Sequence, residues 1–380
     1  MKGERPTTAS VDLAALAHNY AEVVRLAEGR QVIAVVKADA YGHGAVPVAR
    51  RLVAAGCTRL AVTTVAEAAE LRAAAVRVPL LLLGGIHDAA EADDAVELAL
   101  VPVVQHAGHV ALLARAARER GQRLEVELEV DTGMARMGVP PEDVAALAAS
   151  IAREGMLSLQ GVYTHLACAD EADLSSTLRQ LALFGEVIAG LRARSLAPPL
   201  VHVANSAALV ASPELAAAMP PEVNAVRPGL LLYGVQPSLE RAGVARLEPV
   251  MSLRTRVANV RHVRRGDPVG YGATFRAKQR GRIATLPIGY ADGVPWSVGN
   301  RGTVLLRGRR LRIVGRVSMD LLTLDVGELP VEIGDRVLLF GRADSERLPV
   351  EQLAEAAGTI PYELLVRVGH RVPRVLEDGD

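Results

Sequence analysis

Lys37 is the residue in this sequence whose position most suggests chemistry. It follows an apolar, strand-like segment directly and precedes a glycine-rich turn, in "VIAVVKADAYGHG". Alternation along a strand from Val32 to Val36 would place Lys37 on the same face as Ile33 and Val35. An ammonium group that is buried without a partner costs several kcal/mol or shifts its pKa. A single lysine at the end of a strand usually reaches water, so the role of Lys37 has to be judged from the other polar residues around it.

Other polar residues also stand where strand-like segments end. Arg136 follows one in "VDTGMARMG", His165 ends "VYTH", Asn205 and Ser206 end "HVANS", and Arg227 ends "NAVR". In a barrel of parallel strands these ends meet at one rim, where active sites of such barrels lie. A polar pocket above an apolar floor is the usual form of a small-molecule site.

A lysine in such a pocket favours imine chemistry. Its amine can condense with a substrate carbonyl or with the aldehyde of pyridoxal phosphate. The second option also needs a phosphate cradle and a group that faces the pyridine nitrogen. Ser206, the Gly229-Leu230 turn and Arg227 are candidates for these roles. The residues alone therefore predict a lysine–imine enzyme and leave its carbonyl partner open.

Composition and motifs exclude several other classes. The 380 residues carry 43 Lys and Arg against 43 Asp and Glu, which gives no electrostatic case for nucleic-acid binding. The two cysteines have no metal-binding spacing, and no HExxH or GxGxxG motif follows a strand. No apolar stretch approaches membrane length, and the start lacks a signal-peptide core. We expect a soluble cytoplasmic protein that binds neither metal, nucleic acid nor membrane.

The first part of the chain alternates strands with amphipathic, alanine- and leucine-rich helices. This alternation predicts parallel strands with right-handed crossovers. Eight of them fit a closed (β/α)8 barrel over residues 11–243, and an open doubly wound sheet is the alternative. Asp12 is the expected N-cap of the first helix. The predicted strands cover residues 31–37, 59–64, 79–84, 100–105, 124–131, 159–165, 200–206 and 224–227.

The pattern changes after about residue 244. Helical periodicity gives way to short strands with Gly-Asp pairs and isolated glycines, which are signals for hairpins and bulges. Two helices are expected near the end, in "PVEQLAEAAG" and "IPYELLVRVG". We predict a mainly-β domain over residues 244–380, against which residues 1–10 pack.

Ten short motifs, in order along the chain, resemble those of the alanine racemase family. They are "AVVKADAYGHG", "VDTGMARMG", "THLACAD", "NSAA", "VRPGLLLYG", "GYGATF", "LPIGYADG", "GRVSMD", "GTIPYE" and "RVPR". The resemblance implies a pyridoxal-phosphate enzyme with a barrel and a β domain. It would interconvert L- and D-alanine for peptidoglycan as a head-to-tail homodimer whose active sites are shared between subunits.

The resemblance also implies roles for individual residues. Lys37 would carry the cofactor as an internal aldimine, and the substrate would react as an external aldimine between two bases, Lys37 and Tyr271 of the partner subunit. Arg227 would hydrogen-bond the pyridine nitrogen, and His165 would lie against the ring. Arg136 would orient the substrate carboxylate, which the backbone of Met319 would also bind. The remaining implied residues are Tyr41, Ser206, Gly229, Leu230 and Tyr362 at the phosphate, Asn205 beside the cofactor, and Tyr290 and Asp320 at the entrance.

The sequence departs from the family pattern at several positions. Many members have a carbamylated lysine where this chain has Glu129, so we predict that the Glu129 carboxylate pairs with Arg136 directly. Ala135 replaces a usual glycine, which puts a tight backbone approach in doubt. Ser318 stands where cysteine is common, and "ADGVPWSVGN" lacks an aromatic and an arginine common after "ADG", so the entrance can differ in shape.

Four rival functions were weighed against this one. A broad-specificity or serine racemase of the same fold differs only in side-chain tolerance. A decarboxylase would need an acidic partner for the pyridine nitrogen and a cysteine in the β domain, where none follows Cys168. An aspartic protease would need two facing aspartates on an all-β fold, and only one "DTG" occurs. A non-catalytic pyridoxal-phosphate carrier would have no use for Tyr271 or Met319.

Overall fold

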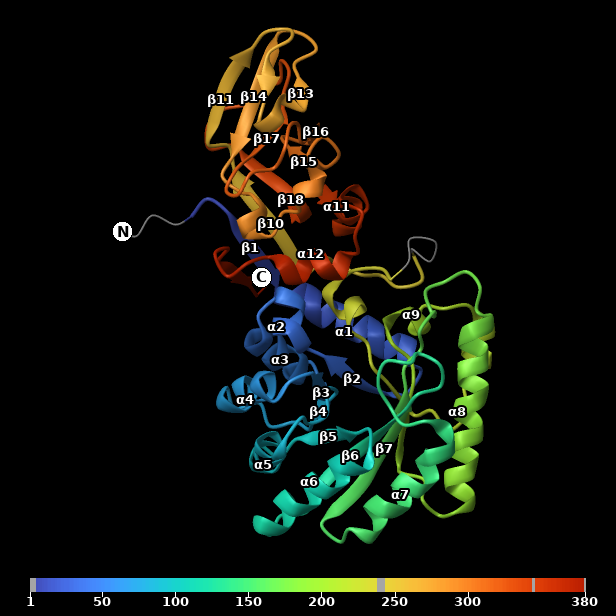
Figure 1. Cartoon of the computed structure of the whole chain (residues 1–380). Helices are drawn as coiled ribbons and strands as arrows, with labels where there is room; N and C mark the ends of the chain where they lie inside the picture. The colour runs from blue at the N-terminus through green and yellow to red at the C-terminus, as the bar shows by residue number, and fades with distance from the viewer. Residues whose placement is uncertain (1–4, 238–242, 344–345, 379–380) are drawn as a thin grey trace.

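The computed structural model describes residues 5–237, 243–343 and 346–378. Two parts stack end to end, a helix-covered barrel below and a β-rich part above (Figure 1). Each part has its own large hydrophobic core. Among the described residues, no helix has the length and apolar character that crossing a bilayer requires.

Eight parallel strands close into a barrel, so the predicted fold class is confirmed and the open-sheet alternative is wrong. All eight predicted strands form. The pairing of β2 with β9, through Gln31 and Ala225, closes the ring. The strands are β2 (Gln31–Val35), β3 (Arg59–Val62), β4 (Leu80–Leu82), β5 (Val101–Val104), β6 (Leu124–Val130), β7 (Leu157–Thr164), β8 (Leu200–His202) and β9 (Ala225–Val226).

Helices cover the outside of the barrel (Figure 1). The first begins after Asp12, whose side chain accepts a hydrogen bond from the backbone N–H of Ala15 at 2.8 Å, as the predicted N-cap requires. The helices are α1 (Leu13–Ala27), α3 (Ala45–Ala54), α4 (Val65–Ala73), α5 (Ala89–Glu97), α6 (Ala107–Glu119), α7 (Val144–Arg153), α8 (Ser175–Ala193), α9 (Ser206–Leu209) and α10 (Pro213–Ala217).

The first barrel strand ends two residues earlier than we predict. It stops at Val35, and Lys37 opens the segment α2 (Lys37–Gly42) instead of continuing the strand face. Four consecutive residues of α2, from Ala38 to Tyr41, have φ between 51° and 54°. Left-handed backbone of this kind costs roughly 1–2 kcal/mol per non-glycine residue, so this turn stores strain beside Lys37.

The β-rich part is built on a sheet of order β16-β15-β18-β10-β1-β20. β1 (Thr8–Asp12) lies inside this sheet, antiparallel to β10 and parallel to β20. Both predicted helices form, as α11 (Val350–Ala357) and α12 (Pro361–Arg367). The other strands are β10 (Met251–Arg256), β11 (Asn259–Val263), β12 (Pro268–Val269), β13 (Phe275–Arg276), β14 (Gly281–Leu286), β15 (Thr303–Leu306), β16 (Arg309–Arg312), β17 (Leu322–Asp325), β18 (Arg336–Ala343), β19 (Glu346–Leu348) and β20 (Arg374–Glu377).

Candidate active site

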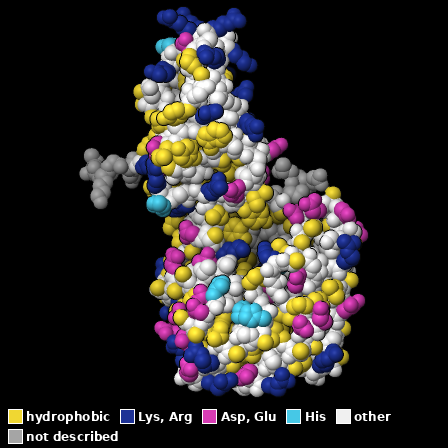
Figure 2. Space-filling model, in the orientation of Figure 1, with side chains coloured by type: hydrophobic (Ala, Val, Ile, Leu, Met, Phe, Trp, Pro, Cys, Tyr) yellow, Lys and Arg dark blue, Asp and Glu magenta, His cyan; other side chains and the backbone are white. Residues whose placement is uncertain are grey.

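A cavity of about 770 Å³ lies at the mouth of the barrel, where the strands end. On the face seen in Figure 2 the surface is hollowed where the two parts of the molecule meet, with Lys and Arg side chains at the edge of the hollow. The cavity brings together eleven residues that the sequence singles out. They are Lys37, Tyr41, Glu129, Arg136, His165, Asn205, Ser206, Arg227, Gly229, Leu230 and Tyr362.

The strained turn places Lys37 and Tyr41 in this cavity. Glu67, on α4, holds the start of the turn, because its Oε1 accepts a hydrogen bond from the Ala38 N–H at 2.7 Å. Its Oε2 accepts one from the Thr63 N–H at 2.8 Å, which ties the turn to the end of β3. At the other end of the turn, Asp39 Oδ1 accepts from the Ala45 N–H at 2.6 Å. These bonds offset part of the cost of the left-handed backbone.

The environment of Lys37 favours a neutral amine. Burial lowers the pKa of its ammonium group, the nearby positive charge of Arg136 lowers it further, and Glu67 opposes both. A neutral amine is the form that attacks a carbonyl and the form that accepts a proton.

One side of the cavity is suited to a phosphate group. Ser206 Oγ accepts hydrogen bonds from the N–H groups of Gly229 at 2.9 Å and Leu231 at 3.3 Å. A Cβ at Gly229 would lie 2.3 Å from the Tyr41 hydroxyl, so only glycine allows the tyrosine to approach this turn. The Tyr362 ring lies close by, with its centroid 6.0 Å from that of Tyr41. Hydroxyls and backbone N–H groups that converge in this way fit an anionic phosphate.

Asn205 stabilises the backbone next to the same region of the cavity. It is the N-cap of α9, and its Oδ1 accepts from the Ala208 N–H at 3.0 Å. Its side chain also lines the cavity. The helix begins at Ser206, within the range predicted as a strand.

Arg227 is buried and held from several sides. Its Nη2 donates to the carbonyls of Thr164 at 2.8 Å and Val203 at 3.2 Å, and its guanidinium lies 4.3 Å from the centroid of the Tyr163 ring. Its Nη2 also lies 3.5 Å from His165 Nδ1. Burial, with the neighbouring charges of Arg227, Arg136 and Lys37, lowers the pKa of His165 to about 3. His165 is therefore neutral at working pH.

The ion pair that we predict between Glu129 and Arg136 is absent from the described structure. Glu129 is buried on β6 and accepts from Gln105 Nε2 at 3.1 Å. Arg136 lies on the exposed loop that follows β6, where Asp131 Oδ1 accepts from the Gly133, Met134 and Ala135 N–H groups. Both side chains line the barrel-mouth cavity, but no ion pair joins them among the described residues. Ala135 has a φ of 54°, which explains why glycine suits this position.

The other four predicted residues lie elsewhere in the same chain. Tyr271, Tyr290, Met319 and Asp320 line a separate hollow of about 560 Å³ in the β-rich part, together with Trp296 and Arg316. Tyr271 is 72% exposed. Asp320 forms an ion pair with Arg371 at 2.6 Å. Within one chain the two groups of residues do not form one cavity.

Sequence reasoning missed three residues that organise the barrel mouth, Glu67, Glu127 and His202. The sequence could have identified Glu67, because Thr64 and Glu67 have the spacing of a capping box, which they form at the start of α4. The sequence also indicates where Glu127 and Glu129 lie, because alternation in "LEVELEV" places both on the inner face of β6. The partner of Glu127 depends on the closure of the barrel, and no local pattern reveals it.

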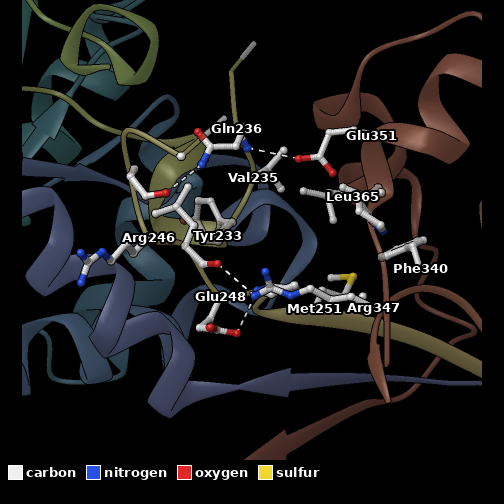
Figure 3. A pocket seen from close by; sticks show the side chains of 18 residues that line it. Tyr233, Val235, Gln236, Arg246, Glu248, Met251, Phe340, Arg347, Glu351 and Leu365 are labelled. Atoms are coloured by element: carbon white, nitrogen blue, oxygen red, sulfur yellow. Dashed lines mark hydrogen bonds and ion pairs between the residues drawn. The ribbon is translucent and has the colours of Figure 1, made fainter. Parts of the chain in front are cut away.

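A third hollow, of about 500 Å³, lies between the barrel and the β-rich part (Figure 3). Several of its polar groups bind one another or the backbone. The Gln236 N–H donates to Glu351 Oε1 at 3.2 Å, and Arg347 binds Glu248 at 2.5 Å and the Leu247 carbonyl at 3.0 Å. Unlike those at the barrel mouth, the described residues that line this hollow include no lysine, histidine or cysteine.

Comparisons with known proteins agree with the geometry of the barrel mouth. The family model described as "Alanine racemase, N-terminal domain" matches residues 11–237, and "Alanine racemase, C-terminal domain" matches residues 250–376. A protein named alanine racemase from Syntrophobacter fumaroxidans is 42% identical over 97% of both chains. One from Desulforamulus reducens is 43% identical over 98% of this chain and 99% of its own.

Solved structures give the same result. The alanine racemase from D-cycloserine-producing Streptomyces lavendulae superposes with a TM-score of 0.92 at 36% identity, covering 100% of this chain and 98% of its own. The biosynthetic alanine racemase of Pseudomonas aeruginosa superposes with a TM-score of 0.88 at 39% identity, covering 98% of this chain and 100% of its own. The chain belongs to the alanine racemase family.

Proposed function

We propose that this chain is an alanine racemase that interconverts L- and D-alanine with pyridoxal phosphate in the cytoplasm and supplies D-alanine for peptidoglycan. The observation that carries the proposal is the barrel-mouth cavity, which combines an amine of lowered pKa with a phosphate-suited turn and a buried arginine. Membership of the alanine racemase family supports the choice of substrate.

Each part of the cavity has a role in this proposal. Bound pyridoxal phosphate draws electrons from the substrate Cα and so makes its hydrogen acidic. Lys37 attaches the cofactor and, as a neutral amine, takes or returns the Cα proton on one face. The Ser206 hydroxyl and the Gly229 turn bind the phosphate, with Tyr41 and Tyr362 beside them. Arg136 binds the substrate carboxylate, with the N–H of Met319 from the partner subunit.

Racemisation needs a second base on the opposite face of the substrate. In the proposal this base is Tyr271 of the partner subunit. Its exposure and its distance from the cavity of its own chain support a homodimer with shared sites. Tyr290 and Asp320 of the partner subunit then line the entrance.

Arg227 favours a racemase over an aminotransferase or a decarboxylase. An arginine keeps its proton, so Arg227 would donate a hydrogen bond to the pyridine nitrogen without protonating it. Held in this way, the cofactor would withdraw electrons less strongly, which would favour return of the substrate proton over other reactions.

The test is a racemisation assay of the purified protein with L-alanine, before and after borohydride reduction. We expect D-alanine to form until the two enantiomers are equal, and the activity to disappear after reduction. A labelled peptide that contains Lys37 should appear in the reduced protein. No turnover of alanine by cofactor-loaded protein, or a label on another lysine, would reject the proposal. Serine and lysine as alternative substrates measure the breadth of specificity.

A further inference from the structure

A buried chain of side chains extends from Arg227 away from the cavity and into the barrel. Arg227 Nη1 lies 2.6 Å from His202 Nδ1, and His202 Nε2 lies 2.7 Å from Glu127 Oε2. Arg227 is 4% exposed, and His202 and Glu127 are 0% exposed. The three residues come from different parts of the barrel, namely the end of β9, β8 and β6.

The two hydrogen bonds fix the protonation of His202. An arginine can only donate, so His202 Nδ1 must be the unprotonated acceptor. A neutral imidazole then carries its hydrogen on Nε2, and this N–H donates to the Glu127 carboxylate. Burial lowers the pKa of His202, although Glu127 opposes this, so the neutral form is favoured.

The two carboxylate oxygens of Glu127 have different neighbours. Oε2 faces His202, whereas Oε1 has no hydrogen-bond partner among the described residues and forms an ion pair with Arg59 Nη1 at 3.6 Å. The barrel leaves room for its side chain, because a Cβ at Gly161 would lie 2.6 Å from Glu127 Cδ. A buried carboxylate costs free energy unless a charge or a donor compensates it. Arg59 supplies a charge at Oε1, and at Oε2 the donor is His202, which links the carboxylate to Arg227.

We propose that Glu127 is a positioning residue that acts through His202 to hold the guanidinium of Arg227 in its working orientation. The carboxylate orients the imidazole, and the imidazole accepts from Nη1 of Arg227. The inference rests on the proposed function, since there Arg227 meets the pyridine nitrogen. Glu127 itself lies outside the cavity lining and touches neither substrate nor cofactor.

The first experiment is nitrogen-15 NMR of the histidines in the protein without cofactor. We expect His202 to have an unprotonated Nδ1 and a protonated Nε2, assigned by the loss of its signals in His202→Phe. A protonated Nδ1 would overturn the proposal. Because this measurement needs no turnover, it remains valid even if the chain does not racemise alanine, which separates its failure from failure of the proposed function.

The second experiment is a double-mutant cycle on the loaded enzyme. Glu127→Leu removes the acceptor, whereas Glu127→Gln keeps an amide oxygen in its place. His202→Phe keeps a ring that can stack on Tyr163, as His202 does with its centroid 4.8 Å away. If Glu127 acts through His202, the effect of Glu127→Leu on kcat disappears in the His202→Phe background. If the two effects multiply instead, Glu127 acts independently and the proposal is wrong.

The expected size of the effect is taken from residues that orient metal ligands. Removing such an orienting residue lowers activity by about ten- to a hundredfold. We expect Glu127→Leu to lower kcat by about tenfold or more and to weaken pyridoxal-phosphate binding to the apoenzyme, with little change in the KM for alanine. Glu127→Gln should recover most of the loss. Glu125→Leu, an exposed position on the same strand, is the matched control. A Glu127→Leu enzyme with the kcat and cofactor affinity of the control would overturn the proposal.

Discussion

The barrel mouth and the hollow around Tyr271 differ in how far each is assembled in one chain. At the barrel mouth, buried residues hold one another, and Arg227 alone contacts two carbonyls and a histidine. Around Tyr271 the side chains are exposed, and Tyr290 and Met319 are uncovered too. The contrast suggests that the barrel carries a preorganised half of a site, while the β-rich part carries a half that needs another surface.

The barrel and the β-rich part also differ in net charge. Residues 11–243 contain 19 Lys and Arg against 26 Asp and Glu, a net charge of −7. Residues 244–380 contain 22 against 16, a net charge of +6. The neutral total of the sequence therefore conceals a marked asymmetry, and the proposed head-to-tail dimer would bring the opposite charges together.

The largest expected effect comes from the barrel side. In the proposed mechanism, Lys37→Ala removes both the cofactor attachment and one base, and a lost proton-transfer group alone typically costs about 10²–10⁴-fold. We expect no measurable racemisation and no borohydride label. Lys278→Ala, which changes an exposed lysine of the β-rich part, is the control and should keep full activity.

Tyr271→Phe tests the β-rich part, because it removes the hydroxyl of the proposed second base. The rate of racemisation should fall by about 10²–10⁴-fold, because one face of the substrate loses its base. Cofactor binding and the thermal midpoint should stay unchanged, since Tyr271 lies outside the barrel cavity. A loss of bound cofactor would contradict the division into two half-sites.

A mixture of the two variants sharpens this division. If sites are shared in a twofold dimer, unfolding and refolding equal amounts of Lys37→Ala and Tyr271→Phe chains restores about a quarter of wild-type activity. Half of the dimers are then mixed, and each mixed dimer has one intact site. No recovery in dimers that have demonstrably mixed would place both bases in one chain.

Acid should destabilise the barrel through its buried histidines. Burial lowers the pKa of His43 and His109 to about 4 and of His165 to about 3, from 6.5. The unfolded chain therefore binds more protons between pH 6.5 and these values, and stability is lost as the pH falls through this window. Each of these histidines should lower the free energy of unfolding of the apoenzyme by about 2–3 kcal/mol between pH 6.5 and 4. His109→Gln should reduce the slope, and an unchanged slope would argue against a neutral buried histidine there.

The charge asymmetry predicts slower dimer assembly in salt. Electrostatic steering of opposite charges raises association rates by about 10–10³-fold, and salt screens it. We expect the association rate, measured by stopped-flow light scattering, to fall by about tenfold between low and high salt. An association rate that is independent of salt would show that the two net charges do not face each other.

The smallest effect tests the backbone of the loop that carries Arg136. Ala135→Gly relieves a left-handed backbone conformation and should raise the free energy of unfolding by up to about 1 kcal/mol. Ala111→Gly, at an exposed position inside α6, should lower it by about 0.5–1 kcal/mol. Urea unfolding measures the change in the free energy of unfolding for both variants. If both changes have the same sign, the positive φ of Ala135 does not control stability at this position.

The sequence predicts the barrel well because each strand is a local apolar run and each helix has a local period. Lys37 and Arg227 follow closely after the ends of their strands, so the carboxyl-end rule of barrels suffices to bring them together. The left-handed turn after Val35 was not predictable, since alanines at positive φ have no sequence signal. The partners of Glu129 and Glu127 were missed for a different reason. They depend on which strands close the ring and on where a loop points, and alternation specifies neither.

The place of β1 inside the upper sheet has a consequence for biosynthesis. Residues 8–12 are synthesised well before their two neighbours in the sheet, residues 251–256 and 374–377. At a rate of about 5–20 residues per second, this segment waits many seconds for its second neighbour while the barrel between them can already form. Expression of residues 250–380 alone would omit an interior strand and expose two edges, so we expect that fragment to aggregate unless a peptide of residues 5–12 is supplied.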